Sequence, residues 1–90
     1  MVREILAVPR QRLAAFCEEY RLTARQRSVL TMLVEGFAPK EIAAWFSISA
    51  VTVRRHAEEV YLKCGTRNQR ETLALVARAM MHYDEREDVA

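Results

Sequence analysis

The sequence has little glycine, proline or cysteine and no long hydrophobic run. Two residues of each of these three types occur among 90 residues, and 51% of the chain is hydrophobic. This composition indicates one helix-rich globular domain rather than a disordered chain. No apolar stretch approaches the roughly 18–20 residues that cross a bilayer, and the N-terminus lacks the small-residue cleavage site of a signal peptide. We therefore expect a cytoplasmic protein with no membrane partner.

The chain also lacks the residue clusters that carry catalysis or hold metals. Cys17 and Cys64 are too few and too far apart for a metal site or a disulfide framework, and both fall at apolar helical positions. We expect them to pack as small hydrophobic groups. Without a nucleophile–base arrangement or a glycine-rich phosphate loop, we expect no enzymatic activity, no cofactor and no metal.

Positive charge is concentrated in the body of the chain. The formal net charge is +2, but the final stretch DEREDVA, residues 84–90, holds four acids and one base, which leaves a net charge of +5 on residues 1–83. A basic body with an acidic tail favours an anionic partner such as nucleic acid.

Hydrophobic periodicity predicts five helices and no strand. The first follows Pro9 and ends near residue 20, and the others begin after Thr23, at Pro39, after Ser49 and at Asn68. Thr23 with Gln26, and Asn68 with Glu71, have the spacing of a capping box, and Ser49 is a favourable N-cap. Gly36 and Gly65 are suited to end the second and fourth helices.

The third and fourth helices, at about 39–46 and 50–64, have the spacing of a helix-turn-helix, whose second helix enters the major groove. A helical wheel of residues 50–64 places Val53, Ala57, Val60 and Cys64 on the core face. The opposite face presents Val51, Arg55, Glu58 and Leu62, flanked by Thr52, Arg54 and Glu59. Arginine pairs with guanine in the commonest specific contact to a base.

Residues 22–76 resemble the DNA-binding domain of the LuxR/GerE family of bacterial transcriptional regulators. The resemblance is carried by LT.R at 22–25, VL at 29–30, Gly36, KEIA at 40–43, IS at 48–49, TV followed by a basic residue and His at 52–56, and by Lys63 and Gly65. In combination these motifs are specific, although each alone would be weak.

The resemblance implies an all-α fold of four helices, here with an extra N-terminal helix. It implies a sequence-specific regulator of transcription that binds double-stranded DNA, with 50–64 as the recognition helix, commonly as a homodimer on an inverted repeat. The residues implied to face bases are Arg54, Arg55 and Glu58. Those implied to lie at the DNA backbone are Thr23, Lys40, Thr52, His56 and Lys63, and those for the dimer are Thr72 with exposed Leu75 and Ala79. The expected division is 1–21 for an arm and helix, 22–83 for the helix-turn-helix domain and 84–90 for the acidic tail.

Several alternatives remain open from the residues. Glu58 either accepts a hydrogen bond from cytosine or is solvated, and Glu59 is interpreted as a solvated charge. His56 is interpreted as a packed structural residue near the DNA backbone. Gln26 stands where the family usually has glutamate, so a buried ion pair common in the family is expected to be missing.

Two larger questions also stay open. The helix after Pro9 either covers the core or extends a dimer interface, and the dimer strip is either an interface or ordinary core and surface. The rival function is a helix-turn-helix protein-interaction module that sequesters another regulator, with little DNA binding.

Overall fold

The described part of the chain consists of helices joined by short turns. The structure is a computed structural model that describes the backbone of residues 10–89 and the side chains of residues 10–81. Its helices are α2 (Arg10–Glu19), α3 (Ala24–Val34), α4 (Pro39–Phe46), α5 (Ala50–Cys64) and α6 (Gln69–Val89). The predicted all-α fold is confirmed, and the arm expected before the first helix lies outside the described residues.

Local side chains set the helix starts much as their spacing predicts. Thr23 and Gln26 form the capping box of α3, with Gln26 N donating to Thr23 Oγ1 at 3.2 Å and Thr23 N donating to Gln26 Oε1 at 3.1 Å. At α5, Ser49 Oγ accepts from Thr52 N at 3.0 Å. Gly65 ends α5 with φ of 71°, a left-handed conformation that glycine adopts without a Cβ penalty.

The start of α6 differs in detail from the predicted box. Asn68 Oδ1 accepts from Glu71 N at 2.9 Å, as a cap should. The Glu71 carboxylate, however, accepts from the backbone N–H of Arg67 at 2.9 Å, one residue before the position expected. The helix then continues to Val89, through residues 84–89 of the expected tail.

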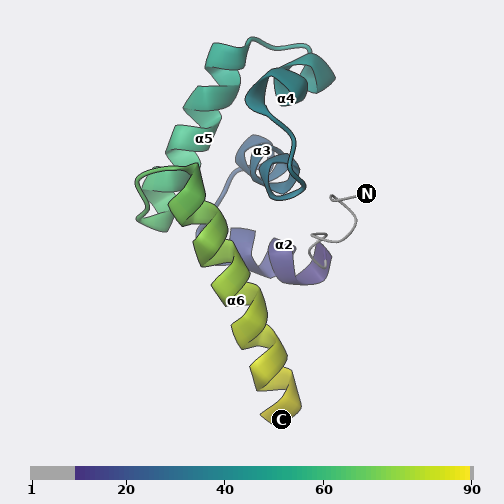
Figure 1. Cartoon of the computed structure of the whole chain (residues 1–90), viewed down its shortest axis with the longest axis vertical. Coiled ribbons are helices and arrows are strands. Elements are labelled where there is room, and N and C mark those ends of the chain that lie inside the picture. The colour runs from purple at the N-terminus through teal and green to yellow at the C-terminus, as the bar shows by residue number, and fades with distance from the viewer. Residues whose placement is uncertain (1–9, 90) are drawn as a thin grey trace.

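The helix-turn-helix is formed by α4, α5 and the turn between them at the upper end of the molecule (Figure 1). Ser47 adopts a left-handed conformation with φ of 56°, and Ile48 N donates to Ala43 O at 3.0 Å. The helices are held by a cluster of buried residues, namely Val29, Leu33, Ile42, Ala43, Val53 and Ala57. This cluster fixes the angle at which α5 leaves the body of the protein.

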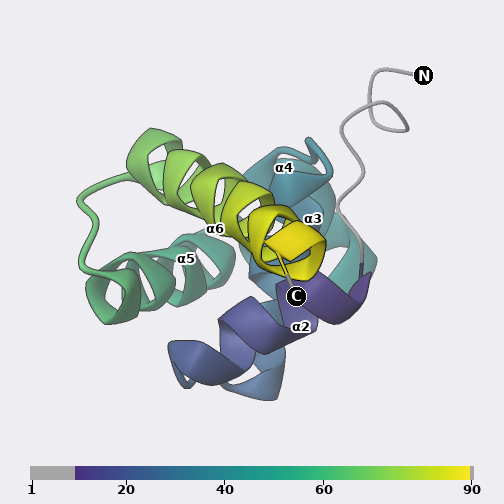
Figure 2. The ribbon, with the colours of Figure 1, turned by 90° about the horizontal axis from the view of Figure 1, so that it is seen from below.

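A second cluster joins α2 to the rest of the fold. It contains Leu13, Phe16, Cys17, Leu30, Val60, Cys64, Val76 and Met80. Seen from the C-terminal end, α2 lies next to α6, whose last turns point towards the viewer (Figure 2). The extra N-terminal helix therefore covers core, which was one of the two alternatives, and both cysteines pack there as apolar groups.

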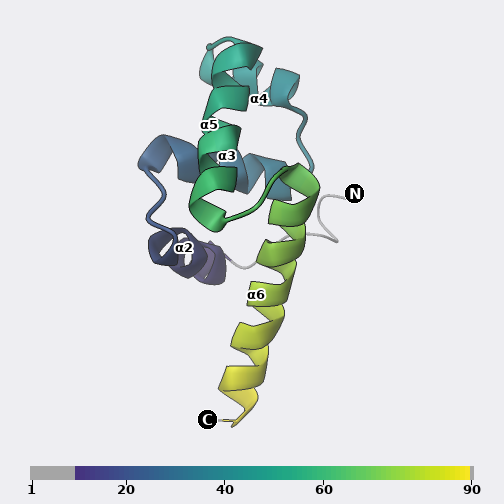
Figure 3. The ribbon, with the colours of Figure 1, turned by 90° about the vertical axis from the view of Figure 1, so that its left-hand side faces the viewer.

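The long helix α6 leaves the body at the end opposite the helix-turn-helix (Figure 3). In the described part of the chain, no helix combines the length and the hydrophobicity needed to cross a membrane.

Candidate nucleic-acid interface

The outward face of α5 carries a continuous stripe of exposed side chains. Val51, Arg55, Glu58 and Leu62 follow one another at spacings of four, three and four residues, which places them along one side of a helix. All four are exposed, with Val51 at 65% and Leu62 at 79% of their full accessible surface. Arg54 is exposed beside this stripe, so the N-terminal half of the face presents two cations and one apolar side chain.

Polar groups gather around the starts of α4 and α5. Thr52 is half-buried, and its hydroxyl lies 2.9 Å from Ser49 Oγ. Lys40 is exposed in the first turn of α4, next to Pro39. A helix N-terminus with free N–H groups and nearby cations is suited to a phosphate oxygen. The starts of α4 and α5 are therefore suited to contact an anionic backbone.

One flank of α5 is tied to α3 by a polar network that we call the α3–α5 clasp, formed by Thr23, Gln26, Glu59 and Lys63. Gln26 is 5% exposed and is the hub. Its Oε1 accepts from Lys63 Nζ at 2.8 Å, and its Nε2 donates to Glu59 Oε1 at 3.0 Å. Lys63 Nζ also donates to Arg21 O at 3.0 Å. The clasp links the start of α3 to the middle and end of α5.

Glu59 was interpreted as a solvated charge; its side chain is 44% exposed, but it also accepts the hydrogen bond from Gln26, which that interpretation did not include. The hydrogen bond from Gln26, followed by the interaction with His56 and the charge of Arg55, holds the pKa of Glu59 below its ordinary value of 4.5. Desolvation opposes this shift and is smaller than the first of these effects. Glu59 is thus an ionised hydrogen-bond acceptor inside the clasp.

His56 lies at the edge of the same network. Its Nδ1 is 3.6 Å from Glu59 Oε1, too long for a hydrogen bond, and its side chain is 24% exposed. Nδ1 is buried, and no described residue forms a hydrogen bond with it. The side chain is therefore half-packed against the protein, as the structural interpretation predicts.

The other flank of α5 borders a shallow groove. Arg54 and Glu58 line this groove on the α5 side, and Pro39 lines it at the start of α4. The turn before α6 contributes Arg67, whose guanidinium lies 3.4 Å from the Glu71 carboxylate. Arg54 and Glu58 are thus neighbours on an open surface that the clasp does not reach.

The residues expected to form a dimer strip are more buried than predicted. Thr72 is 1% exposed, donates to Asn68 O at 2.9 Å and contacts the Thr66 hydroxyl. Leu75 and Ala79 are half-buried against the cluster that includes α2. The expectation that Leu75 and Ala79 are exposed is wrong, and Thr72 belongs to the core, because this face of α6 packs against its own chain.

Two features of this surface were not identified from the sequence. The guanidinium of Arg25 lies over the Phe46 ring, 4.5 Å from its centroid, and so joins α3 to the end of α4. Val51 was placed on the outward face but given no role. The helical wheel was the signal for Val51, whereas the Arg25 contact joins residues 21 positions apart and has no local signal.

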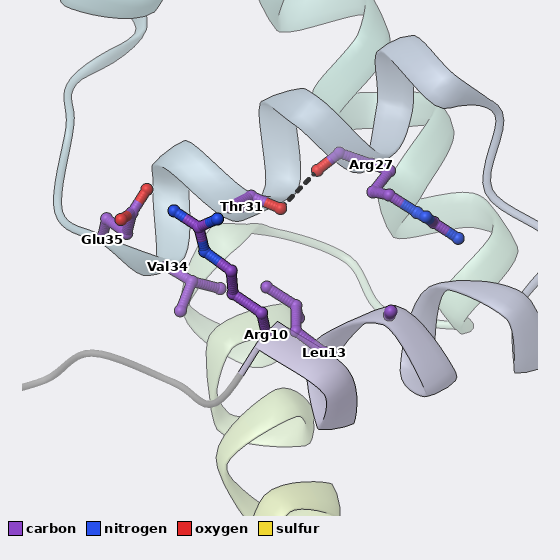
Figure 4. A pocket seen from close by; sticks show the side chains of 7 residues that line it. Arg10, Leu13, Arg27, Thr31, Val34 and Glu35 are labelled. Atoms are coloured by element: carbon purple, nitrogen blue, oxygen red, sulfur yellow. Dashed lines mark hydrogen bonds between the residues drawn. The ribbon is translucent and has the colours of Figure 1, made fainter.

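A separate cleft lies between α2 and α3 (Figure 4). The Arg10 side chain extends from α2 towards α3, while that of Arg27 points away from the other labelled side chains. The cleft is lined by residues of α2 and α3 and of the C-cap of α3, and by none of α5: Arg10, Leu13, Ala14, Arg27, Thr31, Val34 and Glu35. This cleft is therefore distinct from the α5 surface.

Comparison with known proteins identifies relatives of the region that contains the helix-turn-helix. Residues 20–77 match the GerE family, described as bacterial regulatory proteins of the luxR family. The chain is 38% identical over 55 residues to a protein of Escherichia coli (strain K12) named "Putative HTH-type transcriptional regulator YhjB", which covers 61% of this chain and 28% of that protein. No solved structure shows a significant match.

Two further relatives have similar names. The chain is 41% identical over 49 residues to "Probable transcriptional regulator ycf29" of Cyanophora paradoxa, covering 54% of this chain and 23% of that protein. It is 41% identical over 54 residues to "Probable transcriptional regulatory protein SgaR" of Hyphomicrobium methylovorum, covering 60% and 26%. The chain thus spans about a quarter of the length of the curated relatives it matches. Because the family match covers more than half of the chain and contains the whole helix-turn-helix, the chain belongs to the luxR family of bacterial regulatory proteins.

Proposed function

We propose that the protein is a sequence-specific, double-stranded DNA-binding regulator of transcription, with α5 in the major groove. It acts by binding and not by catalysis. The observation that carries this proposal is the exposed face of α5, where Arg54, Arg55 and Glu58 are unobstructed while the opposite face is buried. The names of the relatives, all regulators of transcription, agree with it.

Within this proposal the side chains divide by the part of DNA that they contact. Arg54 and Arg55 donate to base edges, where a bidentate pair with guanine contributes about 1–3 kcal/mol of discrimination. Glu58 accepts from cytosine, since a carboxylate elsewhere in the groove would be repelled by phosphates. Lys40, Thr52, Thr23, His56 and Lys63 lie nearer the phosphates and set the register. For Thr23 and Lys63 this role is shared with the clasp, which orients α5.

We also propose a homodimer on an inverted repeat, as two-fold sites require. Thr72 takes no part, because its side chain is in the core. The exposed remainder of α6, next to half-buried Leu75 and Ala79, is the surface available for pairing. The mass of the complex on a selected duplex tests this, since a dimer gives two chains per inverted repeat.

The test is selection from random-sequence duplexes, followed by fluorescence anisotropy at about 50 and 200 mM salt. Arg54→Ala and Arg55→Ala are compared with Arg10→Ala, which removes one exposed arginine from the start of α2. The three variants lose the same charge, so a difference between them reports contact rather than long-range attraction.

The proposal predicts an enriched sequence that the α5 variants bind at least about tenfold more weakly, the effect of 1.4 kcal/mol, while Arg10→Ala changes little. Weak, unselective binding that disappears by about 200 mM salt would contradict it. That outcome favours the rival function, a helix-turn-helix module that sequesters another regulator, and directs the search to a protein partner.

A further inference from the structure

Val51 is the one apolar side chain in the N-terminal half of the α5 stripe, and it is largely uncovered by the described residues. It lies in the first turn of α5 and is 65% exposed, while the clusters beneath hold Val53 and Ala57. Its side chain is therefore available to an apolar group of a partner that lies against the first turn of α5. We propose that Val51 packs against the C5-methyl group of a thymine and so selects A·T at one position of the operator.

This proposal rests on the proposed DNA-binding function and adds a specificity-determining residue to it. The thymine methyl is the apolar feature in the major groove that distinguishes T·A from the other base pairs. An apolar side chain on the face that inserts into the groove matches that methyl and cannot satisfy a donor or acceptor. The occupant is duplex DNA rather than a protein because the same face carries exposed Arg54 and Arg55.

The position of Val51 relative to Arg55 restricts where the thymine lies. Four residues of helix rise about 6 Å, and successive base pairs are about 3.4 Å apart. When α5 enters N-terminus first, Val51 and Arg55 therefore face base pairs one or two steps apart. The operator should contain a thymine within two base pairs of the guanine that Arg55 contacts.

Leu62 provides an internal control. It lies on the same stripe and is 79% exposed, so its truncation removes a comparable apolar surface. It stands eleven residues after Val51, about 16 Å along the helix, near the end that faces away from the bases. Val51→Ala and Leu62→Ala are both exposed substitutions in a helix to a strong helix former, and both variants are expected to fold.

The experiment replaces each thymine of the selected duplex by uracil, which deletes only the methyl group, and measures binding by anisotropy. The wild-type protein should lose about three- to fivefold in affinity at one position near the Arg55-dependent guanine, as expected for one methyl group removed from a buried contact. Val51→Ala should bind the thymine duplex more weakly by a similar factor and should be insensitive to uracil at that position. Leu62→Ala should respond to uracil as the wild-type protein does.

The outcomes separate this inference from the function on which it rests. If an Arg55-dependent sequence is selected but Val51→Ala and the wild-type protein respond equally to uracil at every position, the Val51 inference is overturned and the proposed function stands. If Leu62→Ala rather than Val51→Ala becomes insensitive to uracil, the methyl contact lies at the other end of α5 and the Val51 inference is overturned. If no sequence is selected at all, both proposals fail.

Discussion

At the scale of residues, Gln26 determines how α5 is held. It is neutral, yet its amide joins Glu59 and Lys63, which carry opposite charges on the same helix. An amide can donate to the carboxylate and accept from the ammonium at once, whereas a carboxylate can only accept. The negative charge of this network is thus carried by Glu59 and not by residue 26.

We therefore expect Gln26→Glu to destabilise the fold by about 1–3 kcal/mol, because it places a second carboxylate against Glu59 and removes the donor in a buried position. Gln26→Glu/Glu59→Gln should recover most of the loss, since one donor and one charge are restored. Urea unfolding followed by far-UV circular dichroism measures both. Tryptophan emission is a poor probe because the single tryptophan, Trp45, is already 75% exposed.

Ser28→Glu is the matched control for this pair. It adds the same charge to α3, at a residue whose hydroxyl donates to Ala24 O of its own helix. We expect it to change the free energy of unfolding by no more than about 0.5 kcal/mol. If Gln26→Glu lowers the free energy of unfolding by the same amount with and without Glu59→Gln, residues 26 and 59 do not interact and the clasp is contradicted.

The lowered pKa of Glu59 predicts a pH dependence. Because the folded state favours the ionised carboxylate, its contribution to stability is present above the ordinary pKa of 4.5 and is lost as pH falls through the lower folded pKa. The difference in Tm between the wild-type protein and Glu59→Gln should therefore shrink between pH 6 and pH 3 in thermal melts. A difference that stays constant over this interval would show that ionised Glu59 contributes nothing.

The sequence predicted local contacts between residues better than distant ones. The Thr23–Gln26 box follows from a spacing of three residues within one helix start. The bonds from Gln26 to Glu59 and Lys63 join residues 33 and 37 positions apart, and no spacing rule reaches that far. Thr72 was misplaced for the same reason, because its burial depends on how α6 packs and not on its neighbours in the chain.

At the scale of elements, the turn between α4 and α5 sets the direction of the candidate recognition helix. Ser47 has a φ of 56°, a conformation that costs an L-residue roughly 1 kcal/mol. The next residue, Ile48, donates its backbone N–H to the carbonyl oxygen of Ala43 in α4. Because the turn is short, its backbone conformation determines the direction of α5 relative to α4.

Ser47→Gly should raise the free energy of unfolding by about 0.5–1 kcal/mol, because glycine adopts this conformation without the Cβ penalty. Ser47→Val should lower it, since a β-branched residue is least suited to positive φ. Urea unfolding measures both. A destabilised Ser47→Gly would mean that this turn is not left-handed.

The helix α2 is expected to be part of the cooperative fold. Phe16 is 1% exposed, its ring centroid lies 4.7 Å from that of Tyr20, and the same cluster contains Val76 and Met80 of α6. Phe16→Leu should cost on the order of 1 kcal/mol and Phe16→Ala about 3–5 kcal/mol in a single transition. If Phe16→Ala leaves the unfolding transition unchanged, α2 does not contribute to the stability of the cooperative fold.

The elements themselves were well predicted because their signals are local. Pro39, Ser49 and Gly65 mark the bounds of α4 and α5 where the structure has them. The start of α6 was nearly right, but the Glu71 carboxylate accepts from Arg67 N, one residue before the cap, instead of from the N–H of the cap residue. The packing of α2 against α6 was left open, since an apolar stripe does not identify the surface that covers it.

At the scale of the whole molecule, the charge distribution suits binding to nucleic acid. Residues 1–83 carry a net charge of +5, and the acidic segment follows at the C-terminal end of the chain. The helix-turn-helix and the last turns of α6 lie at opposite ends of the described structure (Figure 1). The separation limits competition between acidic residues and DNA, because charges beyond about 8–10 Å are screened at physiological salt.

The most direct test of the account is the ratio of affinities for the selected duplex and for a scrambled duplex of equal length, measured by anisotropy at about 200 mM salt. A protein that contacts bases through α5 should keep a ratio of about a thousandfold or more. The ratio should fall at least about tenfold in Arg55→Ala and stay unchanged in Arg10→Ala. A ratio near one in the wild-type protein would contradict the account, because it would leave only attraction to phosphates.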